Sequence, residues 1–204
     1  EPYQQVLDLS DGIQHPKWCL GGKTNVVLNC LDKHRSTSAW NKTYLVWEGE
    51  DGEKREFSYA DFDAEVCRFA GALRAQGIGR GDVVAMFVPM IPEAMTSFFG
   101  ILKVGAIVLP LFSGFGPEPL RVRLGDSEAR AVVTADGGPR RGTASPMKSI
   151  LDEALLDCPS VTDVFVVRRM GNAVDCPMLT GRDHWWHEAL APHPSEAETE
   201  RTDA

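Results

Sequence analysis

Between residues 83 and 167 the chain alternates short, unbroken apolar runs with segments of helical periodicity. The runs are VVAMFV (83–88), AIVLPLF (106–112), AVVT (131–134) and VFVV (164–167). Runs of this length are typical of strands that are covered on both faces. Because helical segments lie between them, the pattern predicts an α/β fold in which a layered, parallel-rich sheet is flanked by helices. Pro110 places the second strand at a sheet edge or a bulge.

The residues before this region predict a β-hairpin and a long helix. Asp51-Gly52 separates two extended stretches in TYLVWEGEDGEKREFS (43–58), and Asp-Gly between apolar runs favours a hairpin. Ser58 and Asp61 have the spacing of a capping box, so we expect a helix after Ser58 that ends near Gly77. Further helices are expected from Pro92 to Leu102, from Pro117 to Leu124 and over 149–156.

The two ends of the chain lack this alternation. Residues 1–42 show no sustained period, and we expect an N-terminal strap that lies over the α/β portion, residues 43–194. The last ten residues, SEAETERTDA (195–204), carry four acids and no apolar face beyond alanine. We therefore expect a solvated acidic linker there. Since no closing element follows, the chain is expected to be a fragment.

Composition is that of a soluble globular protein. Apolar residues make up 43% and charged residues 25% of the chain, both ordinary values. No run approaches the roughly 18 apolar residues of a membrane span, and the acidic start is not a signal peptide. A net charge of −8 argues against nucleic acid as a partner. The cysteines form no C-x-x-C pair, so we expect them to be reduced and mostly buried: Cys19, Cys30, Cys67, Cys158 and Cys176.

One segment departs from the acidic balance. Residues 121–148 carry six basic and three acidic residues, which fits either a solvated surface or a site for an anionic ligand. Just before it, VLPLFSGFGPEPL (108–120) reads as a strand that enters a glycine-containing turn and opens a helix. Many phosphate-binding loops have this layout. The sequence therefore raises the question of which phosphate-bearing ligand this turn could hold.

The turn fits the dinucleotide fingerprint only in part. Gly114 and Gly116 begin a G-x-G-x-x-G pattern, but Pro119 occupies the position of the third glycine. Asp136 stands at about the distance of the acid that binds a ribose in such sites. A nicotinamide- or flavin-dependent oxidoreductase thus stays open as an alternative, beside a turn that only connects a strand to a helix.

Two other motifs have more ordinary explanations. LGGKTN (20–25) ends like a P-loop, but Lys17 occupies the position of the first glycine and no strand is expected before it. His184 and His187 in GRDHWWHEAL have the spacing of one helical face. Without a third ligand, we expect helix-surface histidines beside an aromatic anchor. No catalytic residue and no metal ligand is predicted anywhere in the chain.

Five blocks of sequence occur in a characteristic order: WCLGGKTNVVLNCLDKH (18–34), YLVWEGEDGEKREFSYADFDAEVCRFAGAL (44–73), GDVVAMFVPMIPEAM (81–95), LKVGAIVLPLFSGFGPEPLRVRLGDSEARAVVTAD (102–136) and GRDHWWHE (181–188). Together they resemble the AMP-forming acyl-CoA synthetases of the adenylate-forming superfamily, within them the acetyl-CoA synthetase branch. The resemblance implies the N-terminal part of the large domain of such an enzyme. The enzyme joins a short-chain carboxylate such as acetate or propionate to coenzyme A through an acyl-adenylate.

The resemblance also implies the ligands and the partners of the whole enzyme. ATP, Mg²⁺ and coenzyme A serve the full-length protein in the cytoplasm. The ATP-gripping loop and the catalytic lysine of the family would follow position 204. The fragment alone is therefore expected to be inactive, to bind none of these ligands tightly, and to pair with the remainder of its own polypeptide or with itself. The alternative is a non-catalytic nucleotide-binding or interaction module of the same fold.

One ligand site of the family falls within this chain. By resemblance, Phe112, Ser113 and Gly114 form a turn along the nucleotide of coenzyme A, and Arg140 pairs with its phosphates. Ser113 stands in the place of a glycine and Thr143 in the place of a second arginine. Arg141 is expected to compensate for that second arginine.

Overall fold

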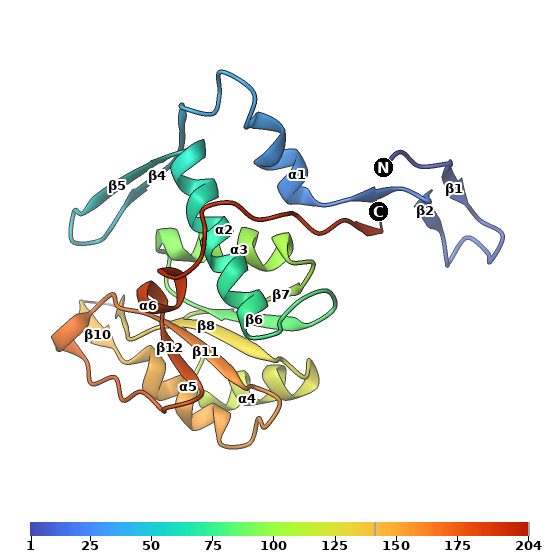
Figure 1. Cartoon of the computed structure of the whole chain (residues 1–204). Coiled ribbons are helices and arrows are strands. Elements are labelled where there is room, and N and C mark those ends of the chain that lie inside the picture. Colours follow the sequence, from blue (N-terminus) through green and yellow to red (C-terminus); the bar gives the residue numbers. More distant parts are fainter. Residues whose placement is uncertain (141, 204) are drawn as a thin grey trace.

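The computed structural model describes residues 1–140 and 142–203. Five strands form a central sheet in the order β12-β11-β8-β6-β7, and all four neighbouring pairs are parallel. The α/β class that the sequence predicts is confirmed (Figure 1). In chain order the strands are β6 (Val83–Phe87), β7 (Ile107–Pro110), β8 (Ala131–Ala135), β11 (Asp163–Val167) and β12 (Asp183–Trp185).

Helices cover both faces of the sheet, as Figure 1 shows. One face packs on α2 (Tyr59–Ala75), α3 (Pro92–Lys103) and α6 (Trp186–Leu190), and the other on α4 (Pro117–Asp126) and α5 (Met147–Leu155). Alternate strand residues point to opposite faces. Val84 and Met86 therefore enter one core cluster, whereas Ala85 and Phe87 enter the other. Burial on both faces explains the unbroken apolar runs.

The predicted start and stop signals are confirmed. β4 (Thr43–Glu48) and β5 (Lys54–Ser58) form the antiparallel hairpin. The Ser58 hydroxyl accepts from the Asp61 N–H while the Asp61 carboxylate accepts from the Ser58 N–H, which is a complete capping box. Gly77 ends α2 with a positive φ of 69°. β7, which contains Pro110, lies at the edge of the five-stranded sheet. α5 begins two residues earlier than expected, at Met147.

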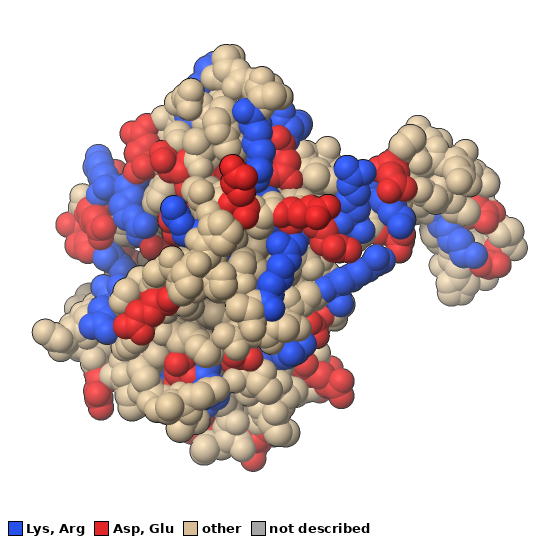
Figure 2. Space-filling view, viewed as in Figure 1, with Lys and Arg blue, Asp and Glu red and all other residues tan. Residues whose placement is uncertain are grey.

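The N-terminal residues divide into two differently packed parts. β1 (Gln5–Asp8) and β2 (Lys17–Leu20) pair as a hairpin that projects from the body (Figures 1 and 2). After β3 (Lys23–Thr24), α1 (Val26–Cys30) and a short 3-10 helix, η1 (Asp32–His34), lie against the body. Val27 and Leu31 are buried there beside Phe62. The packing of a strap over the domain thus begins at about residue 25.

The acidic C-terminal segment packs through part of its backbone, while Glu196, Glu198 and Asp203 remain exposed. β13 (Thr202–Asp203) pairs with β3, Thr199 is buried, and the Glu200 N–H donates to the Lys103 carbonyl at 2.8 Å. The expectation of a solvated segment thus holds for these carboxylates and fails for the backbone around Thr199, whose packing the acidic composition did not reveal. The division into strap, α/β portion and linker stays a prediction.

None of the helices within 1–140 and 142–203 is long and apolar enough to cross a membrane. The five cysteines are free. Cys67 and Cys158 are buried, while the other three are only half-buried, so the expectation of mostly buried thiols is wrong. The three half-buried ones lie in or beside short peripheral elements, where less of the chain covers them.

Candidate functional site

Three loops meet at the carboxyl end of the sheet. Pro89 follows β6, the segment from Phe112 to Gly114 follows β7, and Gly138 to Arg140 follow β8. The chain runs from β6 to β7 on one side and then crosses to β8 on the other side of β6. Parallel sheets bind ligands in the crevice at such a reversal of strand order. The topology therefore marks this edge as a binding site.

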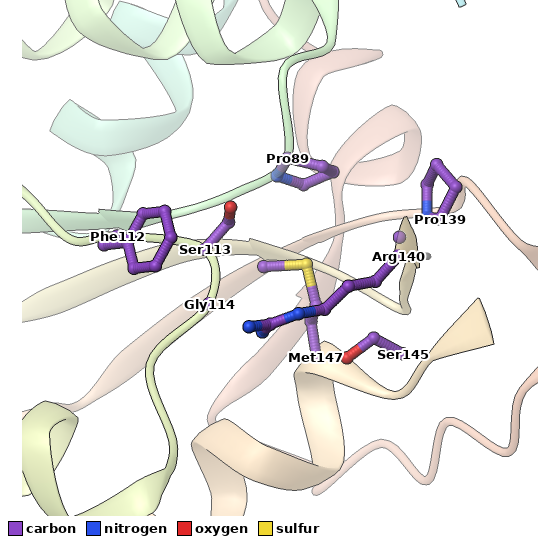
Figure 3. Close-up of a pocket in the computed structure, with 9 residues that line it drawn as sticks. Pro89, Phe112, Ser113, Gly114, Pro139, Arg140, Ser145 and Met147 are labelled. Atoms are coloured by element: carbon purple, nitrogen blue, oxygen red, sulfur yellow. The ribbon is translucent and has the colours of Figure 1, made fainter. Parts of the chain in front are cut away.

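The loops enclose a cavity of about 200 Å³ (Figure 3). Pockets that hold a whole drug-sized ligand are larger, roughly 300–1,000 Å³. The cavity is therefore suited to one end of a larger ligand. Its walls are Pro89, Phe112, Ser113, Gly114, Gly138, Pro139, Arg140, Ser145 and Met147.

Arg140 supplies the positive charge of the cavity. It ends the strand β9 (Gly138–Arg140), which pairs with β10 (Thr143–Ser145) in a short hairpin. Figure 3 shows its side chain extending toward Gly114. The residue is exposed, and no carboxylate within the described parts of the chain forms an ion pair with it. An exposed, unpaired guanidinium is suited to an anionic ligand.

Most of the other cations of the basic segment 121–148 have partners within the fold. These partners neutralise or cover most of the positive charge of the segment. Among its described cations, Arg140 is the one that faces the cavity. The partners are Glu118 for Arg121, Asp82 for Arg130, Asp152 and Asp183 for Lys148, and the Phe115 ring for Arg123.

Gly114 and Phe112 form the opposite wall. The Phe112 ring is 65% exposed and packs edge-on against Phe115, with centroids 5.6 Å apart. A Cβ on Gly114 would lie 2.5 Å from the Phe112 ring and 3.0 Å from an Arg140 guanidinium nitrogen. Only glycine permits this close approach of the backbone to both side chains. A flat ring, bare backbone and a guanidinium together suit a planar group that carries phosphate.

The structure brings together four of the five residues expected at the coenzyme A site. Phe112, Ser113, Gly114 and Arg140 line one cavity, whereas Arg141 lies outside the described residues. Thr143 donates its hydroxyl proton to the Arg140 carbonyl at 2.9 Å, so it serves the hairpin turn. Sequence reasoning missed the remaining wall residues. Their signal was positional, since Pro89 directly follows an apolar run that forms a central strand.

A buried ion network supports the cavity from behind. Lys148, in the first turn of α5, lies 2.7 Å from Asp183 and 2.7 Å from Asp152, and the neighbouring residue, Met147, lines the cavity. Burial alone would raise the pKa of Asp183, but hydrogen bonds from Arg182 and Lys148 lower that pKa below its usual value. The network fixes the start of α5 and thereby the Met147 wall.

The alternative sites of the sequence do not assemble. Asp136 is buried and occupied by backbone N–H groups, so its carboxylate is not available to a ribose. His184 lies on β12, 2.9 Å from Asp163, and His187 lies on α6. The expectation of a shared helical face is wrong because the strand ends between them at Trp185.

The structure also shows where the residues of LGGKTN lie. A strand, β2, does precede LGGKTN, contrary to expectation, but Lys23 and Thr24 belong to β3 rather than to a phosphate loop. Sequence alternation does not predict β2, because the hairpin that contains it buries little of its surface. No cluster of three metal-ligating side chains occurs within residues 1–140 and 142–203.

A parallel α/β sheet with a cavity at its strand-order reversal is the arrangement in which many α/β proteins bind nucleotides. The chain belongs to the AMP-binding enzyme family, whose profile matches residues 31–201. Acetyl-coenzyme A synthetase of Gemmatimonas aurantiaca is 44% identical over 92% of this chain and 29% of the relative. The enzyme of the same name from Mycolicibacterium smegmatis is 42% identical over 96% of this chain and 20% of the relative.

A solved structure shows the same fold. The acyl-CoA synthetase of Brucella canis superposes with a TM-score of 0.70 at 25% sequence identity, over 88% of this chain and 29% of that chain. The present chain thus spans less than a third of the length of the relatives named here. The relatives identify its family and its fold, and they leave most of their own length unmatched.

Proposed function

We propose that this chain is the N-terminal part of an AMP-forming acyl-CoA synthetase that makes a short-chain acyl-CoA such as acetyl- or propionyl-CoA. The family match and the named acetyl-CoA synthetases support this proposal. In the reaction a carboxylate oxygen attacks the α-phosphorus of ATP and pyrophosphate leaves. The coenzyme A sulfur then attacks the acyl carbon, and AMP leaves as the thioester forms.

The observation that carries the proposal for this chain is the convergence of Phe112, Gly114 and Arg140 on one cavity. The nucleotide end of coenzyme A has an adenine ring for the Phe112 face and phosphates for the Arg140 guanidinium. Gly114 lets the backbone approach the ring. Ser113 lines the same wall, and Arg141 is proposed to add a second positive charge beside Arg140.

The catalytic groups are proposed to lie in the remainder of the polypeptide. That remainder would supply the loop that grips ATP and the catalytic lysine, and Mg²⁺ would accompany ATP and screen its charge. The isolated chain is accordingly proposed to be inactive. We propose the cytoplasm as the location of the enzyme and the rest of its own polypeptide as the partner of this chain.

The test compares Arg140→Ala with Arg121→Ala in the full-length polypeptide. Arg121 is an arginine on α4 that pairs with Glu118 outside the cavity. A hydrogen bond to a charged group contributes about 1.5–3 kcal/mol, so Arg140→Ala should raise the KM for coenzyme A roughly 10- to 100-fold. The KM for ATP and the acetate-dependent exchange of pyrophosphate into ATP should not change, and Arg121→Ala should match the wild type.

Two results would overturn the proposal. If the full-length wild type forms no thioester from acetate or propionate, the synthetase assignment is wrong and a non-catalytic module is the better description. If thioester forms but Arg140→Ala leaves the KM for coenzyme A unchanged, the cavity is not the coenzyme site.

A further inference from the structure

Asp136 stands between β8 and the wall of the cavity, four residues before Arg140. Its side chain is 1% exposed. One carboxylate oxygen accepts from the N–H groups of Gly137, Arg169 and Met170, at 2.7, 2.8 and 2.9 Å. The other oxygen accepts from the Gly171 N–H at 2.8 Å. Four backbone donors thus surround a single buried carboxylate.

These hydrogen bonds join the ends of two neighbouring strands. Gly137 follows β8, whereas residues 169–171 follow β11 and lead into the short 3-10 helix η2 (Gly171–Ala173). The backbone continues the link, since the Asp136 N–H donates to the Val167 carbonyl at 2.9 Å. Hydrogen bonds to a carboxylate are stronger than those to a neutral acceptor. Asp136 therefore fixes where the chain leaves the sheet.

The two residues after Asp136 leave no room for adjustment. A Cβ on Gly137 would lie 2.7 Å from the Ser145 carbonyl oxygen, and one on Gly138 would lie 3.2 Å from Pro89. The β9–β10 hairpin pairs Gly138 with Ser145 and Arg140 with Thr143. The hairpin is thus packed directly against the turn that Asp136 holds, so a shift of this turn moves Arg140.

We propose that Asp136 is a positioning residue for the coenzyme A site: its carboxylate fixes the base of the β9–β10 hairpin so that Arg140 faces the nucleotide of the coenzyme. This inference rests on the proposed function of the cavity. Asp136 does not touch the ligand, and its effect passes through the hairpin. Asparagine replaces it only in part, because its amide nitrogen donates and would face at least the Gly171 N–H, which needs an acceptor.

The test uses Asp136→Asn in the full-length polypeptide, with Asp163→Asn as the matched control. Asp163 is also a buried carboxylate, 7% exposed, but it begins β11 at the opposite end of the sheet. Asp136→Asn should raise the KM for coenzyme A about tenfold, with an unchanged KM for ATP and unchanged pyrophosphate exchange. Asp163→Asn should lower stability without a selective effect on coenzyme A.

Two further measurements separate positioning from a general loss of structure. Residues that act through one another show non-additive effects, so Asp136→Asn should add little to the KM for coenzyme A once Arg140→Ala is present. Gly137→Ala keeps the charge but pushes the hairpin away from its turn, and it should reproduce the same rise. This second variant tests the inference even where Asp136→Asn does not fold.

The outcomes are distinct. The positioning role is overturned if Asp136→Asn raises the KM for both coenzyme A and ATP, or if it raises neither. It is also overturned if the effects of Asp136→Asn and Arg140→Ala on the KM for coenzyme A are fully additive. If the wild type itself shows no thioester formation that saturates with coenzyme A, the proposed function fails first, and this inference fails with it.

Discussion

The cluster around Lys103 and the cavity around Arg140 both contain cations. Only in the Lys103 cluster do these cations form ion pairs with carboxylates. Lys103 is fully buried, and its ammonium donates to Asp32 at 3.2 Å and to Thr199 at 2.9 Å, with Asp63 at 3.8 Å. Arg35 pairs with Asp63 at 2.7 Å. Arg140 has none of these features, since it is exposed and has no ion pair with the described carboxylates.

The difference separates two uses of charge. The Lys103 cluster ties η1, α2, α3 and the C-terminal segment together, and a buried charge is tolerated there because each cation has an anion. Around Arg140 the missing partner would be supplied by a ligand. Substitutions in the first region should therefore change stability, and substitutions in the second should change binding of coenzyme A.

The largest effect is expected from Lys103→Met. Removing one partner of a buried ion pair costs about 3–5 kcal/mol, because Asp63 would remain buried beside fewer cations. Urea denaturation followed by circular dichroism should show the free energy of unfolding reduced by that amount. Lys54→Met is the control, since Lys54 pairs with Glu48 at the surface and exposed pairs contribute only about 0–1 kcal/mol. Equal losses in both variants would refute the distinction.

A smaller effect, confined to binding, is expected from Gly114→Ala. The added Cβ would lie 2.5 Å from the Phe112 ring, so the ring must move and the wall of the cavity changes shape. In the full-length polypeptide the KM for coenzyme A should rise about three- to tenfold, equivalent to roughly 1 kcal/mol, with little change in stability. Gly116→Ala, in the same turn, would meet nothing within 4 Å and should match the wild type. An equal rise in both variants would contradict the role of Gly114.

The two regions also differ in how far the sequence predicts them. The central strands were predictable because runs such as VVAMFV are buried on both faces, and Ser58 with Asp61 announced α2. The Lys103 cluster was not, because its members lie as far apart as Asp32 and Thr199, and only the fold brings them together. Composition described the segment around Thr199 as solvated, although its backbone packs.

The candidate site was predictable from resemblance more than from physical pattern. Phe112, Gly114 and Arg140 were named through the family, whereas spacing alone left a fingerprint interrupted by Pro119. The β9–β10 hairpin escaped prediction because its three-residue strands contain no apolar run. Sequence spacing suggested Asp136 as a ribose-binding acid. Its actual partners at 169–171 lie more than thirty residues away along the chain, so the sequence did not reveal them.

The smallest expected effect tests whether Lys148, which is paired with carboxylates, still activates the thiol of Cys176 nearby. Burial raises the pKa of the Cys176 thiol to about 11, although Lys148 acts to lower it and nearby carboxylates, including Asp152 and Asp183, oppose Lys148. At pH 8 only about one thiol in a thousand would be ionised, and the thiolate is the nucleophile. Alkylation of Cys176 by iodoacetamide, followed by mass spectrometry, should be far slower in the folded than in the unfolded chain and should rise with pH toward 11.

Two variants test the influence of Lys148. Asp152→Asn leaves Lys148 less neutralised, so the pKa of the Cys176 thiol should fall and alkylation at pH 8 should accelerate severalfold. Asp157→Asn removes an acid that does not pair with Lys148, and it should leave the rate unchanged. Equal rates in the folded and unfolded wild type would contradict a raised pKa of the Cys176 thiol, and a faster rate in the folded chain would show that Lys148 activates the thiol despite its carboxylates.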